Sequence, residues 1–210
     1  MEALGRAMDG EVLEIEYRFK CADGNWIWCF SRESVFARNA EGAVSSVIGC
    51  FLDITDRKNS EERTRREHSE TLFANRVLRA FVEHEGDELF DQALGVVQEE
   101  MASMHGVFGY ILEPGHLHCP SLSKTLDACE IEGKCIHYPP EKWKGLWARA
   151  LKEKRSFYTN EAPPVPPGHL IIHNNLAAPI LFQGDVIGLL NIANKDGGYT
   201  DSDRDTLDRI

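Results

Sequence analysis

The chain has 210 residues, which is enough for one large domain or two small ones. Its apolar fraction of 42% and charged fraction of 27% are those of a soluble globular protein. Lys and Arg total 23 against 34 Asp and Glu, so the net charge is -11, and this field repels nucleic-acid phosphates and anionic lipids. We therefore expect no nucleic-acid partner and no direct contact with a membrane.

The sequence also argues against secretion. The first residues, MEALGRAMDGEVLEIEY, lack the basic start and apolar stretch of a signal peptide, and no apolar run approaches the roughly 20 residues that span a bilayer. The cysteines lie at irregular spacings, which predicts reduced thiols in packing roles. These cysteines are Cys21, Cys29, Cys50, Cys119, Cys129 and Cys135. We expect a cytoplasmic location.

Residues 11–54 predict three antiparallel strands in a meander. EVLEIEYRFK alternates apolar and charged residues, and the Asp-Gly step that follows is typical of a hairpin turn. WIWCFSRESVFARN predicts the second strand, NAEG the next turn, and AVSSVIGCFLDI the third strand. Such a meander has one face to bury and nothing else in this segment covers it, so we expect part of the domain to lie upstream.

A polar helix is predicted to follow the third strand. Helix formers dominate DRKNSEERTRREHSE, with Thr55 or Asp56 as the N-cap, and apolar residues recur at helical spacing only from Leu72 to Val82. Two interpretations stay open: a solvated linker helix, or a rigid coupling element that pairs with a copy of itself. Regular a and d apolar positions, which a coiled coil requires, are poor here.

The remaining residues, about 85–210, predict one α+β domain. We expect an amphipathic helix over 87–104, a strand over 107–112, an irregular segment over 113–140 and a helix over 141–154. A short strand over 156–160, a Pro-rich loop over 161–169 and a hairpin over 176–195 with a Gln-Gly-Asp turn come next. The last helix is predicted to start with Thr200 as its N-cap, and we expect it to continue beyond the end of the chain.

The first third resembles the C-terminal part of a PAS domain. The resemblance rests on Glu16-Tyr17-Arg18 within a strand, on the D-G-x-W-x-W pattern from Asp23 to Trp28, and on G-x-x-x-D-I-T-D-R-K from Gly49 to Lys58. It covers about residues 11–58. The resemblance implies an incomplete PAS segment over 1–55, followed by a signalling helix over 56–84. It also implies that Asp53, Ile54 and Thr55 couple the sheet to that helix, with the Asp53 carboxylate capping or salt-bridging the joint.

Residues 85–210 resemble a GAF domain. The resemblance rests on the helix-first order, on VFGYIL, on the hairpin pattern N-x-L-A-A-P-I-L-x-x-G-D-V-I-G-L-L-N-I-A-N-K and on G-G-Y-T. It implies an α+β fold: an antiparallel sheet with flanking helices, and a ligand cleft on one face, preceded here by the three-stranded PAS meander and the linker helix. It also implies a sensor module of a bacterial multidomain signalling protein, with a downstream output domain of the histidine kinase or diguanylate cyclase type.

Six residues are candidates for binding a small molecule, because an apolar pocket with a few polar groups suits such ligands. They are Tyr110, Trp147, Tyr158, Asn160, His169 and Asn191. Most of them have an equally good alternative as core or turn residues, and His169 has one as a structural histidine in a stiff loop. Asn194 has a simple alternative as the end of its strand. The identity of the ligand, and of any cofactor, stays unknown.

Neither metal binding nor catalysis is expected from the sequence. Histidines and cysteines gather over 115–137, but their spacing matches no standard zinc site. The chain has no G-x-S-x-G elbow, P-loop or H-E-x-x-H motif. We therefore predict a homodimeric, non-enzymatic sensor segment. The alternatives are a structural dimerisation spacer that binds nothing, and a GAF-like redox enzyme that uses cysteines.

Overall fold

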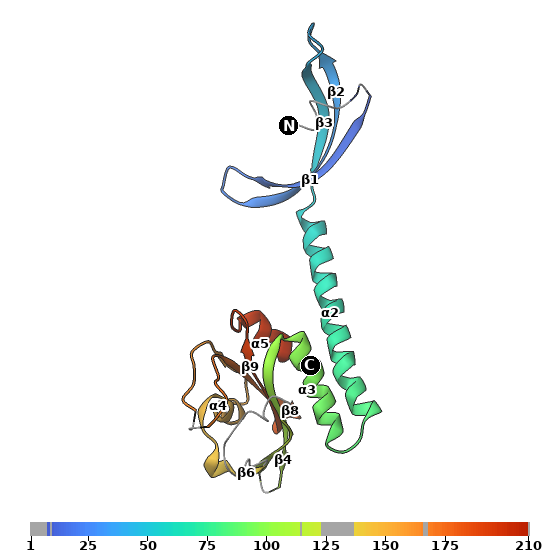
Figure 1. Ribbon diagram of the computed structural model, residues 1–210. Helices are drawn as coiled ribbons and strands as arrows, with labels where there is room; N and C mark the ends of the chain where they lie inside the picture. Colours follow the sequence, from blue (N-terminus) through green and yellow to red (C-terminus); the bar gives the residue numbers. More distant parts are fainter. Residues whose placement is uncertain (1–7, 9, 114, 123–136, 166–167, 210) are drawn as a thin grey trace. The chain divides into compact units, whose positions relative to one another are not determined.

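The structure, a computed structural model, describes residue 8 and residues 10–113, 115–122, 137–165 and 168–209 (Figure 1). The chain divides into two compact units, Met1–His68 and Ser69–Ile210. Helix α2, Thr55–Glu83, begins in the first unit and ends in the second. Among the helices of the described residues, none is both long enough and apolar enough to cross a membrane.

The first unit contains the predicted meander. Strands β1 (Val12–Lys20), β2 (Trp26–Arg38) and β3 (Val44–Asp53) form an antiparallel sheet in the order β1-β2-β3. The register aligns Ile15 with Ser31 and Ser31 with Phe51, so one face is mostly apolar. On that face Phe51 of the edge strand β3 is 73% exposed, whereas Ser31 of the central strand β2 is 2% exposed. The expectation that the rest of this domain lies upstream stays a prediction.

The second unit is built on a six-stranded antiparallel sheet in the order β6-β5-β4-β9-β8-β7. Its strands are β4 (Ser103–Leu112), β5 (His116–Leu122), β6 (His137–Tyr138), β7 (Phe157–Thr159), β8 (Asn175–Phe182) and β9 (Asp185–Lys195). Its own helices are α3 (Glu88–Glu100), the 3-10 turn η2 (Pro140–Lys142), α4 (Gly145–Glu153) and α5 (Asp201–Leu207). The α+β prediction is confirmed.

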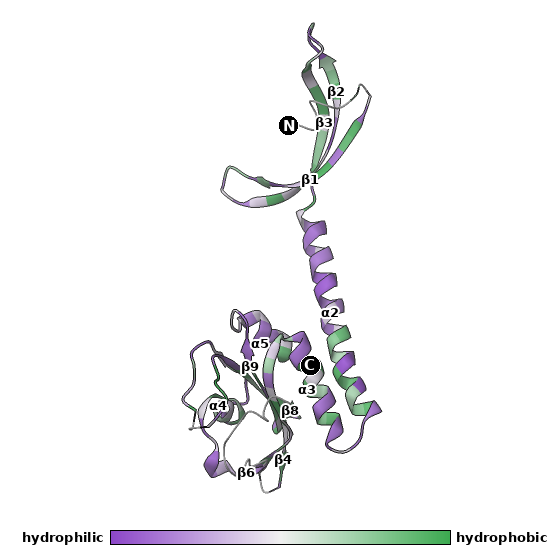
Figure 2. Ribbon diagram, in the orientation of Figure 1, coloured by the Kyte–Doolittle hydropathy of each residue, from purple (hydrophilic) through white to green (hydrophobic). Residues whose placement is uncertain are grey.

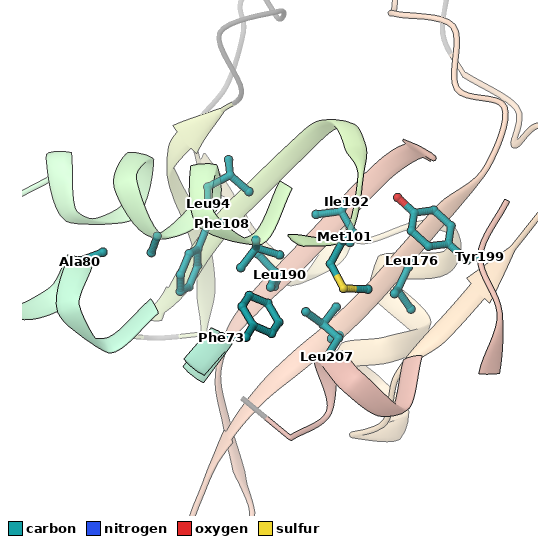
Figure 3. Close-up of a cluster of buried hydrophobic side chains, with 13 residues drawn as sticks. Phe73, Ala80, Leu94, Met101, Phe108, Leu176, Leu190, Ile192, Tyr199 and Leu207 are labelled. Carbon is teal, nitrogen blue, oxygen red and sulfur yellow. The ribbon is translucent and has the colours of Figure 1, made fainter. Parts of the chain in front are cut away.

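Helices cover both faces of this sheet (Figure 1). The last part of α2, together with α3 and α5, packs on what we call the α3 face, where the main core lies. Figure 3 shows the side chains of that core, which include Phe73, Leu94, Phe108, Leu190 and Ile192. Helix α4 packs on the opposite side, the α4 face, against a second core around Leu117, Cys119, Leu151, Ala177 and Leu189.

Helix α2 changes character along its length. Figure 2 shows its first half as hydrophilic and its second half as more hydrophobic. Phe73 and Ala80 are its buried residues, and both belong to the core of the second unit. The apolar positions predicted from Leu72 onward therefore include the buried stripe, while the first half has little apolar surface to bury.

Several predicted boundaries are wrong. The helix predicted over 87–104 ends at Glu100, because Ala102 turns the chain with a left-handed φ of 49° and β4 begins at Ser103. The segment predicted as irregular contains β5 and β6. The helix predicted over 141–154 is a 3-10 turn followed by α4 from Gly145.

The turn of the β8–β9 hairpin is shorter than predicted. Gln183 and Gly184 both have positive φ, 52° and 85°, and they form a two-residue turn, while Asp185 already belongs to β9. Positive φ at both central residues is the geometry of the type I′ hairpin turn, whose twist matches that of the strands. The predicted hairpin is thus present, with Asp185 outside its turn.

The absence of a side chain at Gly188 allows β9 to pack closely against β4. A Cβ placed on Gly188 would lie 2.6 Å from the carbonyl oxygen of Gly109, which is backbone and cannot rotate away. In helix α3, by contrast, a Cβ on Gly95 would meet nothing within 4 Å. Glycine at position 188 is therefore a requirement of the sheet, and glycine at position 95 is not.

We predict opposite effects for alanine at these two positions. Gly188→Ala forces backbone to shift and lowers the free energy of unfolding by about 1–3 kcal/mol. Gly95→Ala removes the entropic cost of a helical glycine and raises that free energy by about 0.5–1 kcal/mol. Urea denaturation followed by circular dichroism measures both. Equal stabilities for the two variants would contradict this account of the sheet.

Candidate functional site

The six predicted ligand residues do not lie together. By register and packing, Tyr110 and Tyr158 belong to the α3 face, where Tyr110 stacks on Phe90 with ring centroids 5.1 Å apart and Tyr158 packs against the main core. Trp147 and Asn191 belong to the α4 face. The tyrosines and the other pair are separated by the sheet, so one cleft cannot contain all four.

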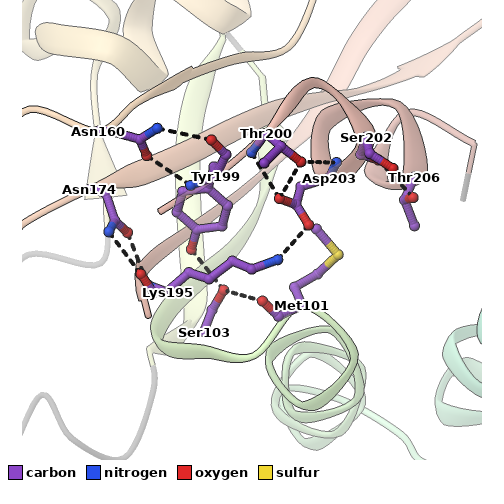
Figure 4. A network of polar contacts seen from close by, with 10 residues as sticks. All are labelled: Met101, Ser103, Asn160, Asn174, Lys195, Tyr199, Thr200, Ser202, Asp203 and Thr206. Carbon is purple, nitrogen blue, oxygen red and sulfur yellow. Dashed lines mark hydrogen bonds and ion pairs between the residues drawn. The ribbon is translucent and has the colours of Figure 1, made fainter. Parts of the chain in front are cut away.

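Asn160 and His169 are engaged with nearby backbone. The Asn160 amide donates to the carbonyl of Tyr199 at 2.9 Å and accepts from its N–H at 2.8 Å (Figure 4). Nδ1 of His169 lies 2.8 Å from the carbonyl oxygen of Leu170, which is the local contact of the structural alternative. Whether either residue also binds a ligand stays a prediction.

A row of mostly polar residues, which we call the polar strip, crosses the α4 face. It lies next to Asn191, which the sequence analysis had named as a candidate. Thr159 pairs with Asn175, Asn175 with Ala193, and Ala193 with His105, so these residues form one row across β7, β8, β9 and β4. Directly paired residues share a face of the sheet. The row lies beside the apolar core under α4, and its small central residue, Ala193, separates Asn175 from His105.

Asn175 is the most informative member of this strip. Its side chain is buried, with 6% of the residue exposed, and its Nδ2 donates to Oδ1 of Asn191 at 3.2 Å. Its own Oδ1 has no hydrogen-bond partner among the described residues. A buried polar atom without a partner costs about 1–3 kcal/mol, so a donor placed at this oxygen would stabilise the fold.

Two histidines meet at the other end of the strip. Burial lowers the pKa of His105, and the charge of the neighbouring His169 lowers it further. Both effects disfavour the protonated form of His105, so its ring is neutral at physiological pH. A neutral imidazole carries one donor and one acceptor nitrogen, so His105 adds a polar group to this end of the strip.

Asparagine amides hold the loop that carries His169. The Asn194 side chain accepts from the N–H of His173 and donates to the carbonyl of Ile171, both at 2.8 Å. Asn194 has a left-handed φ of 60° within β9, which asparagine tolerates better than most residues. Asn194 thus does more than end its strand, because it fixes the loop relative to the sheet.

The strands of the polar strip also hold helix α5 (Figure 4). Lys195, at the end of β9, pairs with Asp203 of α5 at 2.5 Å. Ser103, at the start of β4, donates to the carbonyl of Met101 and accepts from the buried Tyr199 hydroxyl at 2.7 Å. Burial raises the pKa of Tyr199, so the phenol stays protonated and remains a donor.

The N-terminus of α5 is capped as predicted. The Thr200 side chain accepts from the backbone N–H of Asp203, and the Asp203 carboxylate accepts from the backbone N–H of Thr200, which is a complete capping box. At the other end, Asp208 bonds Ser156 and Arg209 bonds Glu70 of α2. Helix α5 is therefore tied both to the sheet and to α2 inside the second unit.

The predicted coupling residues lie at the start of α2. The carbonyl of Ile54 accepts the first helical bond, from Lys58 N–H at 2.9 Å, so Thr55 is the first helical residue and the predicted caps Thr55 and Asp56 lie inside the helix. Oδ1 of Asp53 accepts a hydrogen bond from the backbone N–H of Thr55 at 2.9 Å. This pairs one of the N–H groups that have no partner within the helix at its N-terminus. Asp53 thus pairs one backbone donor of the first helical turn, and its role in coupling the sheet to the helix stays a prediction.

Hydrogen bonds and ion pairs fasten this joint to the sheet. The Thr55 hydroxyl accepts from the N–H of Trp28 at 2.9 Å. On β1, Glu16 contacts Arg57 and Lys58, each at 2.5 Å. Hydrogen bonds from Lys58 and Arg57 hold the pKa of Glu16 below its ordinary value of 4.5. The first turn of α2 is thus fixed to two strands of the first unit.

No metal centre is evident in the described parts of the chain, where no group of three or more His, Cys, Asp or Glu could hold an ion. Four cysteines are described there, Cys21, Cys29, Cys50 and Cys119, and all are free thiols. Cys129 and Cys135, which belong to the histidine and cysteine segment noted in the sequence, lie outside the described residues.

We predict that Glu16→Gln weakens the joint only above acidic pH. A carboxyl whose pKa is lowered in the folded state stabilises that state above its unfolded pKa, and this contribution is lost as the pH falls through the folded value. The variant should therefore melt below the wild type at about pH 7, and the gap should close toward about pH 3. Thermal melts followed by circular dichroism measure the gap.

Glu14→Gln is the matched control, because Glu14 contacts one arginine, Arg32, at 3.2 Å on the same sheet and both side chains are more than half exposed. Its effect on the melting temperature should be smaller. A Glu16→Gln effect that does not change with pH would contradict the role given to these ion pairs.

Comparison with known proteins places both units in families. The model of the PAS fold matches residues 1–51, and the model of the GAF domain matches residues 83–210. A methyl sulfide methyltransferase-associated sensor from Methanosarcina acetivorans is 31% identical over 88 residues. That match covers 38% of this chain and 8% of the sensor, so the chain spans a small fraction of the length of this relative.

Solved structures agree on the fold. The GAF domain of A. aeolicus nlh2, crystallised in an inactive state, is 16% identical and matches with a TM-score of 0.51 over 68% of this chain and 90% of its own. The GAF domain of an Acinetobacter phosphoenolpyruvate-protein phosphotransferase is 13% identical, with a TM-score of 0.51 over 65% and 83%.

A free methionine-R-sulfoxide reductase from Neisseria meningitidis gives a weaker match, from which we draw no conclusion: 13% identity and a TM-score of 0.47 over 67% of this chain and 84% of its own. The GAF model covers more than half of the chain, and its range contains the six-stranded sheet with its flanking helices. The chain carries a PAS-fold segment followed by a GAF domain, and it belongs to the GAF domain family.

Proposed function

We propose that this chain is the regulatory sensor segment of a signal-transduction protein. Its GAF domain binds a small molecule on the α4 face, and α2 and α5 relay the binding event to an output domain of the full-length protein, of the histidine kinase or diguanylate cyclase type. Membership of the GAF family and the similarity to a sensor support this role. The four described thiols form no disulfide, which supports a cytoplasmic location.

The unpaired Oδ1 of Asn175 is the observation that carries the proposal. Proteins rarely leave a buried acceptor without a partner, and the exceptions are enriched where a ligand or water completes the pairing. The acceptor here sits beside Asn191, on strands held rigidly by the sheet. A ligand that presents an N–H or O–H donor would satisfy it.

The surroundings narrow the class of ligand. Ala177 and Leu189 provide an apolar wall next to the asparagines, and Trp147 packs against the same core. His105 adds a neutral polar ring at the far end of the strip. We therefore propose a small, largely apolar and uncharged molecule with at least one hydrogen-bond donor.

The contacts of strand β9 support a relay of the binding event to helices α5 and α2. Strand β9 carries Asn191 on the α4 face and ends at Lys195, which pairs with Asp203 of α5. Helix α5 contacts α2 through Arg209 and Glu70. A ligand that binds more tightly when β9 is in one of two conformations would favour that conformation. It would thereby shift α5 and, through α5, also α2.

No enzymatic activity is proposed for this segment. Of the three cysteines that the redox alternative would use, Cys119 is 1% exposed in the core under α4, and Cys129 and Cys135 lie outside the described residues. The alternative of a spacer that binds nothing predicts a fully satisfied interior on the α4 face. The orphan oxygen of Asn175 favours the sensor over the spacer.

A homodimer is part of the proposal. On the side of α2 turned away from its buried residues, Leu78 is 60% exposed and Val82 is 84% exposed, one helical turn apart. Exposed apolar residues at this spacing form a stripe that suits a second helix of the same kind. A copy of α2 from another chain would cover it.

We predict that replacing both asparagines removes the ligand and leaves the protein stable. The double variant Asn175→Leu/Asn191→Leu removes both side-chain amides of this pair, including the oxygen without a partner. Its free energy of unfolding should therefore be unchanged or higher by about 1 kcal/mol. Asn160→Leu is the contrast, because that amide makes two backbone bonds, and its loss should cost about 1–3 kcal/mol.

The ligand is sought by denaturing the purified chain and identifying the released small molecules by mass spectrometry. The wild type and Asn160→Leu should release the same compound, and the double variant should release none. If the wild type releases nothing, and small-molecule panels do not raise its melting temperature, the spacer alternative is correct.

We predict a dimer that depends on the stripe. Sedimentation velocity of the wild type should give a dimer, and Leu78→Glu/Val82→Glu should give a monomer, because burying four like charges at one interface is unfavourable. Gln92→Glu, at an exposed position of α3, is the control and should stay dimeric. A wild type that remains monomeric at the highest concentration tested would contradict the proposal.

A further inference from the structure

Two histidines stack at the edge of the GAF sheet, apart from the polar strip. His118 of β5 and His137 of β6 are directly paired across the strands, so their side chains share a face. Their rings lie 4.4 Å apart at an angle of 27°, and their Nδ1 atoms are 3.1 Å apart. The sequence places these residues 19 positions apart and gives no sign of the contact.

The spacing of the two nitrogens suits a metal ion. Imidazole nitrogens bind zinc at about 2.0–2.1 Å, so two of them are about 3.3 Å apart at a tetrahedral angle and about 2.9 Å apart at a right angle. The observed 3.1 Å lies between these values. Because the rings are stacked at 27°, both nitrogens can bind one ion after the exposed ring of His137 turns out of the stack.

An aromatic stack holds the pair in position. Tyr110 meets His118 edge to face, with ring centroids 5.0 Å apart, and Phe90 of α3 stacks on Tyr110 at 5.1 Å. His118 is 9% exposed, whereas His137 is exposed. One ligand is thus fixed by packing and the other lies at the surface, where an ion from solvent reaches it.

We propose that His118 and His137 form a binding site for a divalent transition-metal ion of the borderline class, such as Zn²⁺ or Ni²⁺. Imidazole is a preferred ligand for these ions, and the net charge of -11 attracts cations. The described residues contain no group of three possible ligands, so within them this pair is the protein's contribution to the site. Binding joins β6 to β5 through the metal.

The site is tested by isothermal titration of the full chain, kept reduced, with ZnCl₂ and with NiCl₂. The wild type should bind one ion of each, and His137→Gln or His118→Gln should raise the dissociation constant at least ~10-fold. His116→Gln, two residues along β5, and His173→Gln, on a separate loop, are the controls and should bind as the wild type does. Because His137 is exposed, its variant is expected to fold, which circular dichroism verifies.

A second readout reports where the ion binds. Tyr138 follows His137, accepts a hydrogen bond from Nε1 of Trp143 at 2.9 Å and lies 5.8 Å from the Trp147 ring. Ni²⁺ at the site should therefore quench tryptophan fluorescence in the wild type and not in His137→Gln. Titration with Co²⁺ should give no thiolate charge-transfer band in the near ultraviolet. Undiminished binding by His137→Gln, binding abolished by alkylation of the cysteines, or no binding by the wild type would each overturn the proposal.

Discussion

Successive residues of β8 and β9 point to opposite faces of the GAF sheet, so each strand serves two environments at once. Toward the α3 face, Leu176 and Ile192 enter the main core and are completely buried. Toward the α4 face, Asn175 and Asn191 meet in a shared hydrogen bond. The first face fixes the strands against α2, α3 and α5, and this rigid support makes it possible to keep an unsatisfied amide on the second. Any displacement of the asparagines must move the core residues next to them in the chain.

The N-termini of helices α2 and α5 are held by similar interactions. In the first unit, Asp53 caps α2 and Glu16 holds its first turn through Arg57 and Lys58. In the second unit, the capping box of Thr200 starts α5, and Lys195 ties that helix to β9. In both places a carboxylate near a helix N-terminus combines favourable dipole interactions with an ion pair. The polar first half of α2 has little apolar surface to bury, and the contacts of Asp53 and Glu16 fix its start.

The sequence predicted the class of fold, the meander, the hairpin and the Thr200 cap, because turn chemistry and strong periodicity are local properties. It did not predict β5 and β6, since HLHCPSL lacks regular alternation over its whole length and is recognised as a strand through its pairing with β4 and β6. It grouped Tyr110 and Tyr158 with Trp147 and Asn191, although the sheet separates them. Asn175 was missed for a related reason: an amide shows its importance only when burial and the absence of a partner are known. The contact between His118 and His137 likewise depends on register.

A crystal structure of the chain, as purified from cells and without added ligand, tests the central claim most directly. We expect density that does not belong to the protein within about 3.2 Å of Oδ1 of Asn175, in contact with the apolar wall under α4. A protein donor bonded to that oxygen, with side chains of the chain itself filling the α4 face, would contradict the account and leave the GAF domain as a spacer.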